Sequence, residues 1–120
     1  MVVGAVIGPM ERPQVVIVGL PDAAAAGGLR MVGRTSPLTS AQAASLGVVL
    51  TAPTSQHPWP VVIGPGYFGG GEKVAITHVD PVVVAEVSAD TALQAGRWRH
   101  STRFVRYRAD LAVTDLDDVR

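Results

Sequence analysis

The apolar positions of the chain fall into short runs rich in Val and Ile, separated by Gly, Pro and Asp. β-Branched residues favour strands, and the separating residues favour tight turns. Three such runs with short links occupy the N-terminal third, and this arrangement predicts an antiparallel meander. The expected strands are residues 1–7, 14–20 and 29–35, with a hairpin loop over 22–28.

The middle of the chain has a different pattern. Thr39 is a suitable N-cap, and residues 40–46 are good helix formers ahead of a glycine, so one short helix is expected here. Residues 51–71 are rich in Pro and Gly and contain His57 and Trp59. This segment predicts a long irregular loop, and loops of that length in a small domain are usually functional or mobile.

The C-terminal third predicts two principal strands, at 82–88 and 103–108, a weaker strand at 74–78 and a turn or single helical turn at 90–96. Three strands, a helix, a long loop and two further strands follow the element order of an OB-fold. That fold is an all-β, five-stranded Greek-key barrel, here with one short helix between strands 3 and 4. SH3-like and other small barrels have a similar order of strands and helices.

The length of 120 residues is enough for one domain and too short for two. We therefore expect an OB-fold domain over residues 1–112 and a polar C-terminal tail over 113–120, which should fray. The apolar N-terminal segment lacks a basic region and is too short for a signal peptide, and no apolar run reaches the length of a membrane span. The expected location is the cytoplasm, without a membrane partner.

The formal net charge is zero, but the charges are unevenly distributed. Nine of the ten basic residues are Arg, and five of these lie between residues 97 and 108. Net neutrality therefore hides a local basic patch, which is the feature that an anionic ligand senses. There are no cysteines, which excludes disulfides, thiolate zinc sites and a cysteine nucleophile. The three His lack ligand spacing, so no metal site is expected.

Alternation along the last expected strand places Arg106 and Arg108 on one face, with Phe104. The simplest assignment directs Val105 and Tyr107 to the interior, so that the two Arg project outward together. Paired guanidinium groups of this kind suit phosphate oxygens. The alternative is that the Arg side chains only form surface ion pairs with the acidic tail.

Glu86 interrupts an apolar strand, and a carboxylate in that position needs a partner. We expect it to pair with Arg106 or Arg108 on the neighbouring strand, or else to lie on the wet face of its strand. His57 and Trp59 would stack on a nucleic-acid base or pack over the end of the barrel, and packing is the favoured interpretation of Trp59.

Several segments together resemble the C-terminal OB domain of bacterial ATP-dependent DNA ligases, in particular the smaller class associated with end joining and repair. The resemblance covers nearly the whole chain. The C-terminal segments that carry it are residues 83–90 (VVAEVSAD), 96–100 (GRWRH) and 103–111 (RFVRYRADL). The upstream segments are residues 3–6 (VGAV), 11–13 (ERP), 32–35 (VGRT) and 57–60 (HPWP).

In that family the OB domain follows an adenylation domain and contains the last nucleotidyltransferase motif, whose arginines orient the ATP pyrophosphate. The same domain then closes over the minor groove of nicked duplex DNA. By position, the resemblance implies these ATP-phosphate candidates: Arg103, Arg106, Arg108 and Asp110. It implies these DNA-binding candidates at the entry to the motif: Arg97, Trp98, Arg99 and His100.

The chain also departs from the family pattern. Ser101 stands where related ligases often have Pro, and Leu111 stands where many have Lys. The Lys-x-Asp-Gly signature that accepts AMP is absent, and Lys73 lies in Glu-Lys-Val. We therefore expect no catalytic residue and no bound cofactor in this chain alone. ATP and magnesium would belong to a full ligase, with a nucleotidyltransferase domain acting in cis or in trans.

Two other functions fit the sequence. One is a stand-alone OB module for single-stranded nucleic acid. The other is a protein-interaction barrel or degenerate ligase remnant, in which the Arg cluster is only a surface feature.

Overall fold

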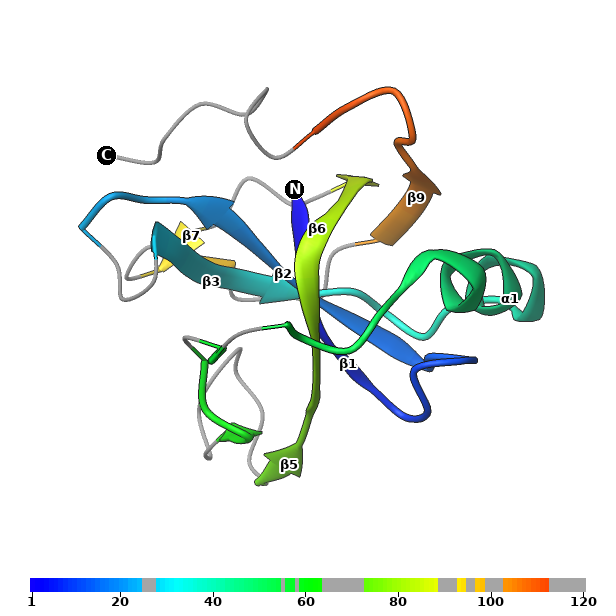
Figure 1. The fold of residues 1–120 in the computed structure, drawn as a ribbon, viewed down its shortest axis with the longest axis horizontal. Coiled ribbons are helices and arrows are strands. Elements are labelled where there is room, and N and C mark those ends of the chain that lie inside the picture. Colours follow the sequence, from blue (N-terminus) through cyan, green and yellow to red (C-terminus); the bar gives the residue numbers. More distant parts are fainter. Residues whose placement is uncertain are drawn as a thin grey trace.

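The computed structural model describes residues 1–24, 28–54, 56–57, 59–63, 73–88, 93–94, 97–98 and 103–112. Five strands form one antiparallel sheet in the order β3-β2-β1-β6-β9 (Figure 1). They are β1 (Val2–Ile7), β2 (Val15–Pro21), β3 (Leu29–Arg34), β6 (Thr77–Ser88) and β9 (Arg103–Tyr107).

The first three strands confirm the expected meander. β6 then returns along a long connection to lie beside β1, so that β6, β1, β2 and β3 have the spatial order of a Greek key. β3 and β9 are the two edges of the sheet, which is open between them in the described part of the chain. A mostly β domain with one short helix is thereby confirmed.

Two short ladders lie outside this sheet. In the expected loop, β4 (Val62–Ile63) pairs with β5 (Val74–Ala75). Further along, β7 (Leu93–Gln94) pairs with β8 (Arg97–Trp98), and β8 runs close to β3. The expected turn over 90–96 is wrong for the two residues of β7, because they form an antiparallel ladder; the other residues of that segment lie outside the described ranges.

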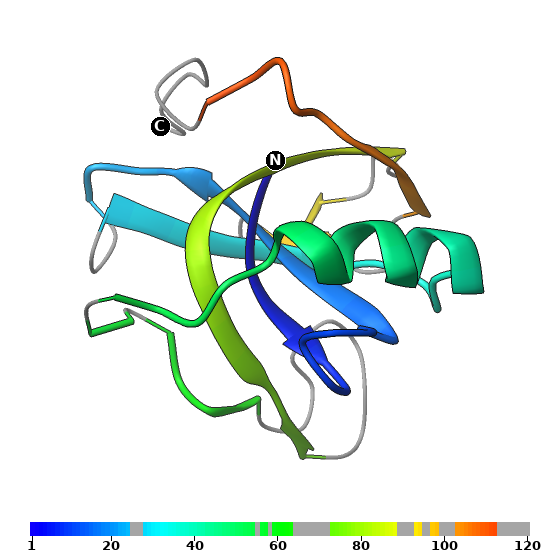
Figure 2. The same cartoon turned by 45° about the vertical axis from the view of Figure 1, so that its right-hand side comes forward.

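β6 is longer than expected, because it continues without a break through Pro81. Its pairing with β1 jumps from Val83, opposite Val3, to His78, opposite Ala5. Proline has no N–H to donate, and it is tolerated in a strand at such an irregularity. The strand curves strongly along its length (Figure 2).

α1 (Ser40–Val49) begins where expected, with a reciprocal capping box. The Gln42 backbone N–H donates to Thr39 Oγ1 at 3.1 Å, and the Thr39 N–H donates to Gln42 Oε1 at 3.0 Å. The expected end at residue 46 is wrong, since the helix runs on through Gly47. A side chain at Gly47 would collide with the backbone carbonyl of Glu11, so this glycine permits close packing rather than ending the helix.

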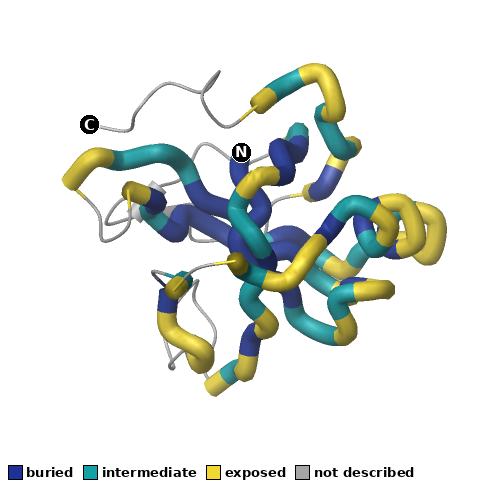
Figure 3. Tube along the Cα trace, viewed as in Figure 1, coloured by how far each residue is buried: buried dark blue, intermediate teal, exposed yellow. Residues whose placement is uncertain are grey.

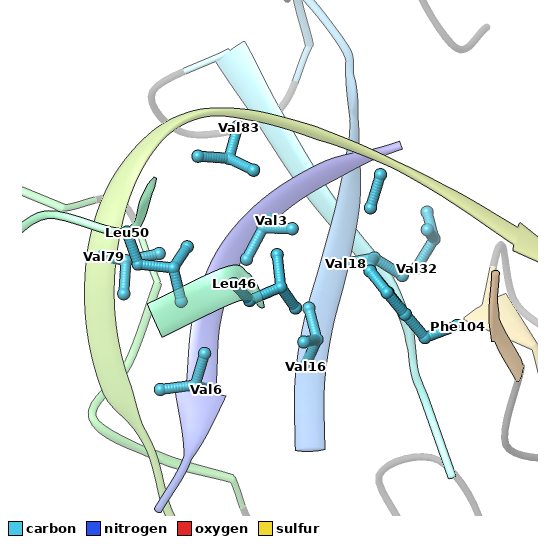
Figure 4. Close-up of a cluster of buried hydrophobic side chains, with 11 residues drawn as sticks. Val3, Val6, Val16, Val18, Val32, Leu46, Leu50, Val79, Val83 and Phe104 are labelled. Atoms are coloured by element: carbon cyan, nitrogen blue, oxygen red, sulfur yellow. The ribbon is translucent and has the colours of Figure 1, made fainter. Parts of the chain in front are cut away.

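Both faces of the sheet are buried in the middle of the molecule (Figure 3). The larger cluster lies between the sheet and α1, where Leu46 packs among Val3, Val16 and Val18 (Figure 4). On the opposite face, Trp59 joins a smaller cluster built on β1, β2 and β3. In the described part of the chain, no helix has the length and apolarity to cross a bilayer.

Candidate functional site

Strand β9 carries the predicted Arg pair, but it does not alternate as expected. Its pairing with β6 shifts between Arg106, opposite Glu86, and Phe104, opposite Val87, so Val105 is the extra residue of a β-bulge. Phe104 is therefore buried, at 4% exposed, while Val105 is 40% exposed. The predicted inward orientation of Val105 is wrong, because the bulge interrupts the period of two.

The bulge has a consequence for the charged residues that follow it. Phe104 and Tyr107 both pack against the larger core cluster although they are three residues apart. Arg106, between them, remains exposed as predicted. The strand thus keeps two apolar anchors on the inside while it presents Arg106 outward.

Glu86 lies between the two arginines, which confirms the expected pairing. Arg106 Nε donates to Glu86 Oε1 at 2.9 Å, and Arg108 Nη1 lies 3.4 Å from the same oxygen. The hydrogen bond from Arg106 is the main reason that the pKa of Glu86 is below its usual value, and Arg108 adds to this effect.

Arg108 has a second acidic partner in Asp110. Its Nε donates to Asp110 Oδ1 at 2.9 Å and its Nη2 to Oδ2 at 2.8 Å, which is a bidentate pair. These hydrogen bonds lower the pKa of Asp110 to about 2 and raise the pKa of Arg108. The backbone N–H of Arg108 also donates to the Val84 carbonyl at 2.8 Å, which extends the attachment of β9 to β6.

The two arginines differ in their exposure and in how many of their N–H donors remain available to a ligand. The Arg106 side chain is 63% exposed, and only its Nε takes part in a hydrogen bond recorded among the described residues. The Arg108 side chain is 27% exposed, and its Nε, Nη1 and Nη2 all face carboxylates. Arg106 is therefore the group that can bind an added anion.

Only some of the other predicted site residues lie within the described ranges. Arg103 is exposed at the start of β9, opposite Ser88. Arg97 and Trp98 form β8, which lies near β3, the edge strand farthest from β9 in strand order. Arg99 and His100 lie outside the described residues, as does the polar tail 113–120.

A shallow cleft of about 220 Å³ adjoins the ion pairs and was not foreseen from the sequence. Glu86, Arg108, Leu111 and Met1 contribute to its lining. The amino group of Met1 donates to the Ala85 carbonyl at 2.7 Å, and burial, followed by the charge of Arg108, lowers the pKa of that amino group. The pairing of β6 with β1 on one side and with β9 on the other brings these residues together, and no local pattern signals it.

Trp59 does not belong to this site. It is 7% exposed and its Nε1 donates to the Leu29 carbonyl at 3.1 Å, which confirms that it packs in the core and leaves no ring face for a base. His57 accepts the Trp59 backbone N–H through Nδ1 at 3.2 Å. Its ring stacks on His78 with centroids 4.1 Å apart, and burial, followed by His78, lowers the pKa of His57.

Within the described ranges, no three His, Asp or Glu side chains gather as a set of metal ligands. Comparisons of the chain with protein-family models, curated proteins and solved structures gave no match. The structure is a small, mostly β fold with a cluster of Arg, Glu and Asp side chains on the edge strand β9, on its neighbour β6 and just after β9.

Proposed function

We propose that this chain is an OB-fold domain of the ATP-dependent DNA ligase type that binds nicked duplex DNA. The architecture supports the proposal, because its main strands have the Greek-key order and its helix lies between β3 and β6, the third and fourth strands of the sheet in chain order. An OB-fold is a partly open five-stranded barrel with this organisation, and it is widely used to bind nucleic acids.

The single observation that carries the proposal is the exposed guanidinium group of Arg106 on the last strand of the sheet, beside Arg108. Guanidinium groups bind phosphate oxygens through paired N–H donors. In the ligase family, the corresponding segment supplies the arginines that act on phosphates, so the resemblance and the geometry indicate the same side chain.

The site does not fit a magnesium ion. Glu86 and Asp110, its two carboxylates, are both bound to arginine, and no third acidic group joins them among the described residues. In our proposal, ATP and magnesium are handled by a separate adenylation domain, in cis or in trans. This chain contributes Arg106 as a phosphate ligand and binds the duplex DNA.

The proposal can be tested by fluorescence anisotropy with a labelled nicked duplex in a series of salt concentrations. The wild-type chain should bind with an affinity that falls steeply as salt rises, because phosphate contacts release counterions. The double variant Arg106→Ala/Arg108→Ala should bind more weakly. Lys73→Ala is the matched control, since it removes an exposed cation next to β5, far from β9 (Figure 1).

A second candidate function is a protein-interaction barrel or ligase remnant. The observation that favours it is that both arginines already have acidic partners, as expected of a surface ion-pair cluster. In that case the wild-type chain has no salt-sensitive affinity for any DNA, and the double variant alters only stability. The absence of such affinity would overturn the ligase-type proposal.

A further inference from the structure

Glu86 links the two arginines of the site in an asymmetric way. Its Oε1 accepts from Arg106 at 2.9 Å and lies 3.4 Å from Arg108 Nη1, so one oxygen serves both guanidinium groups. Arg108 is also fixed by the bidentate contact with Asp110, and Arg106 has no comparable second partner recorded among the described residues. The cluster is therefore able to release Arg106 more readily than Arg108.

We propose that Glu86 is an internal competitor for the ligand, and that Arg106 exchanges this carboxylate for a backbone phosphate when nucleic acid binds. The inference rests on the proposed function and assigns separate roles within its site. Arg106 is the phosphate ligand. Arg108 is a positioning residue that holds Glu86 and remains bound to Asp110 throughout.

The exchange leaves neither partner without a counter-charge. After Arg106 turns to a phosphate, Glu86 still faces Arg108 at 3.4 Å. The Arg106 and Glu86 side chains are 63% and 39% exposed, so water screens their attraction and the pair opens at little cost. The pKa of Glu86 is lowered, and the carboxylate therefore remains a charged competitor at neutral pH.

The roles proposed for Arg106 and Arg108 predict different effects of replacing each residue on DNA affinity and on its salt dependence. Each phosphate contact contributes a slope of about 0.9 in the logarithmic salt plot, or about 3.5-fold in affinity between 50 and 200 mM salt. Arg106→Ala should remove one contact and reduce the fall in affinity over that interval by about 3.5-fold. Arg108→Ala should weaken binding without changing the slope, since it leaves Glu86 to pair with Arg106 alone.

Glu86→Gln should have the opposite effect on affinity. It removes the competing charge of an exposed ion pair, so binding to the nicked duplex should tighten by about threefold. The salt slope should stay unchanged, because the number of phosphate contacts is the same. The matched control is Asp22→Asn, which also removes one carboxylate from an ion pair, with Arg30 at 3.7 Å near the β2–β3 hairpin. This control should raise affinity clearly less than Glu86→Gln does.

The closing experiment measures all four variants and the wild type by anisotropy with a nicked duplex at 50–200 mM salt, after urea unfolding has shown which variants are folded. If the wild type binds but Glu86→Gln tightens binding no more than Asp22→Asn, the exchange is refuted while the proposed function stands. The exchange is also refuted, with the proposed function intact, if Arg106→Ala and Arg108→Ala reduce the slope of the salt plot equally. If the wild type shows no salt-sensitive binding, the proposed function itself fails and the exchange fails with it.

Discussion

Trp59 lies flat against two glycines of the sheet, and this contact allows a sharp test of the packing. A Cβ added to Gly4 would meet Cη2, Cζ3 and Cε3 of the Trp59 ring and no other group so closely. A Cβ added to Gly19 would lie 2.7 Å from the Arg30 carbonyl oxygen as well as 2.7 Å from Trp59 Cζ2. The hydrogen bond from Trp59 Nε1 to the Leu29 carbonyl restrains the ring.

We therefore predict that Gly4→Ala destabilises the protein by about 1–3 kcal/mol, the usual cost of overpacking a core. Trp59→Leu removes the ring atoms that the new methyl group would meet. In that background, Gly4→Ala should cost less than about 0.5 kcal/mol, which gives a coupling free energy of about 0.5–3 kcal/mol between the two positions. Gly19→Ala should remain costly in both backgrounds, because the Arg30 carbonyl belongs to the backbone and stays in place.

The assay is urea unfolding followed by far-UV circular dichroism, which does not depend on the tryptophan. With an m-value of about 2 kcal/mol/M, Gly4→Ala should lower the midpoint by about 0.5–1.5 M in the wild-type background. An equal loss in the Trp59→Leu background would contradict the predicted coupling, since it would show that something other than the ring opposes a side chain at Gly4.

Three further predictions concern stability. Burial, followed by the charge of His78, lowers the pKa of His57 below that of an unperturbed histidine, so unfolding at mildly acidic pH takes up a proton. Urea midpoints should therefore fall as pH drops below about 6.5, and His57→Gln should flatten that fall. Thr35→Val should cost about 1–3 kcal/mol because it leaves the buried Val16 N–H without its acceptor at 3.1 Å, whereas Thr35→Ser should cost less in the same measurement. Thr39→Ala removes the helix cap and should cost about 1 kcal/mol, seen as a lower thermal midpoint.

The strands and the helix start were predictable because each depends on local sequence. The Val-rich runs of β1 and β2 are continuously apolar and end beside Gly8 and at Pro21, and Thr39 with Gln42 specifies the first turn of α1. In each case the residue type and its spacing decide the local conformation, with little help from the rest of the chain.

The failures have a common physical cause, which is tertiary contact. Alternation alone could not show that Val105 is the bulged residue, because the bulge is defined by the register between β9 and β6. Gly47 looked like a helix end, but it lies inside α1 where the Glu11 backbone approaches. The sequence predicted separate strands at 74–78 and 82–88, but β6 runs through Pro81, which is accommodated at the shift in register between β6 and β1.

The candidate site was predictable in part. A lone carboxylate in an apolar strand signals a partner, and Glu86 does pair with both arginines that the sequence offered. The different exposure of Arg106 and Arg108 was not predictable, since it depends on how Asp110 folds back on Arg108 after the strand ends. In our proposal, that difference in exposure separates the phosphate-binding Arg106 from the positioning Arg108.

The most direct test of the central claim compares the affinity of the wild-type chain for a nicked duplex with its affinity for a single strand of the same sequence, at one salt concentration. A ligase-type domain would bind duplex geometry, so we expect tighter binding to the nicked duplex. Equal or tighter binding to the single strand would contradict the proposed function and would favour a single-strand OB module instead.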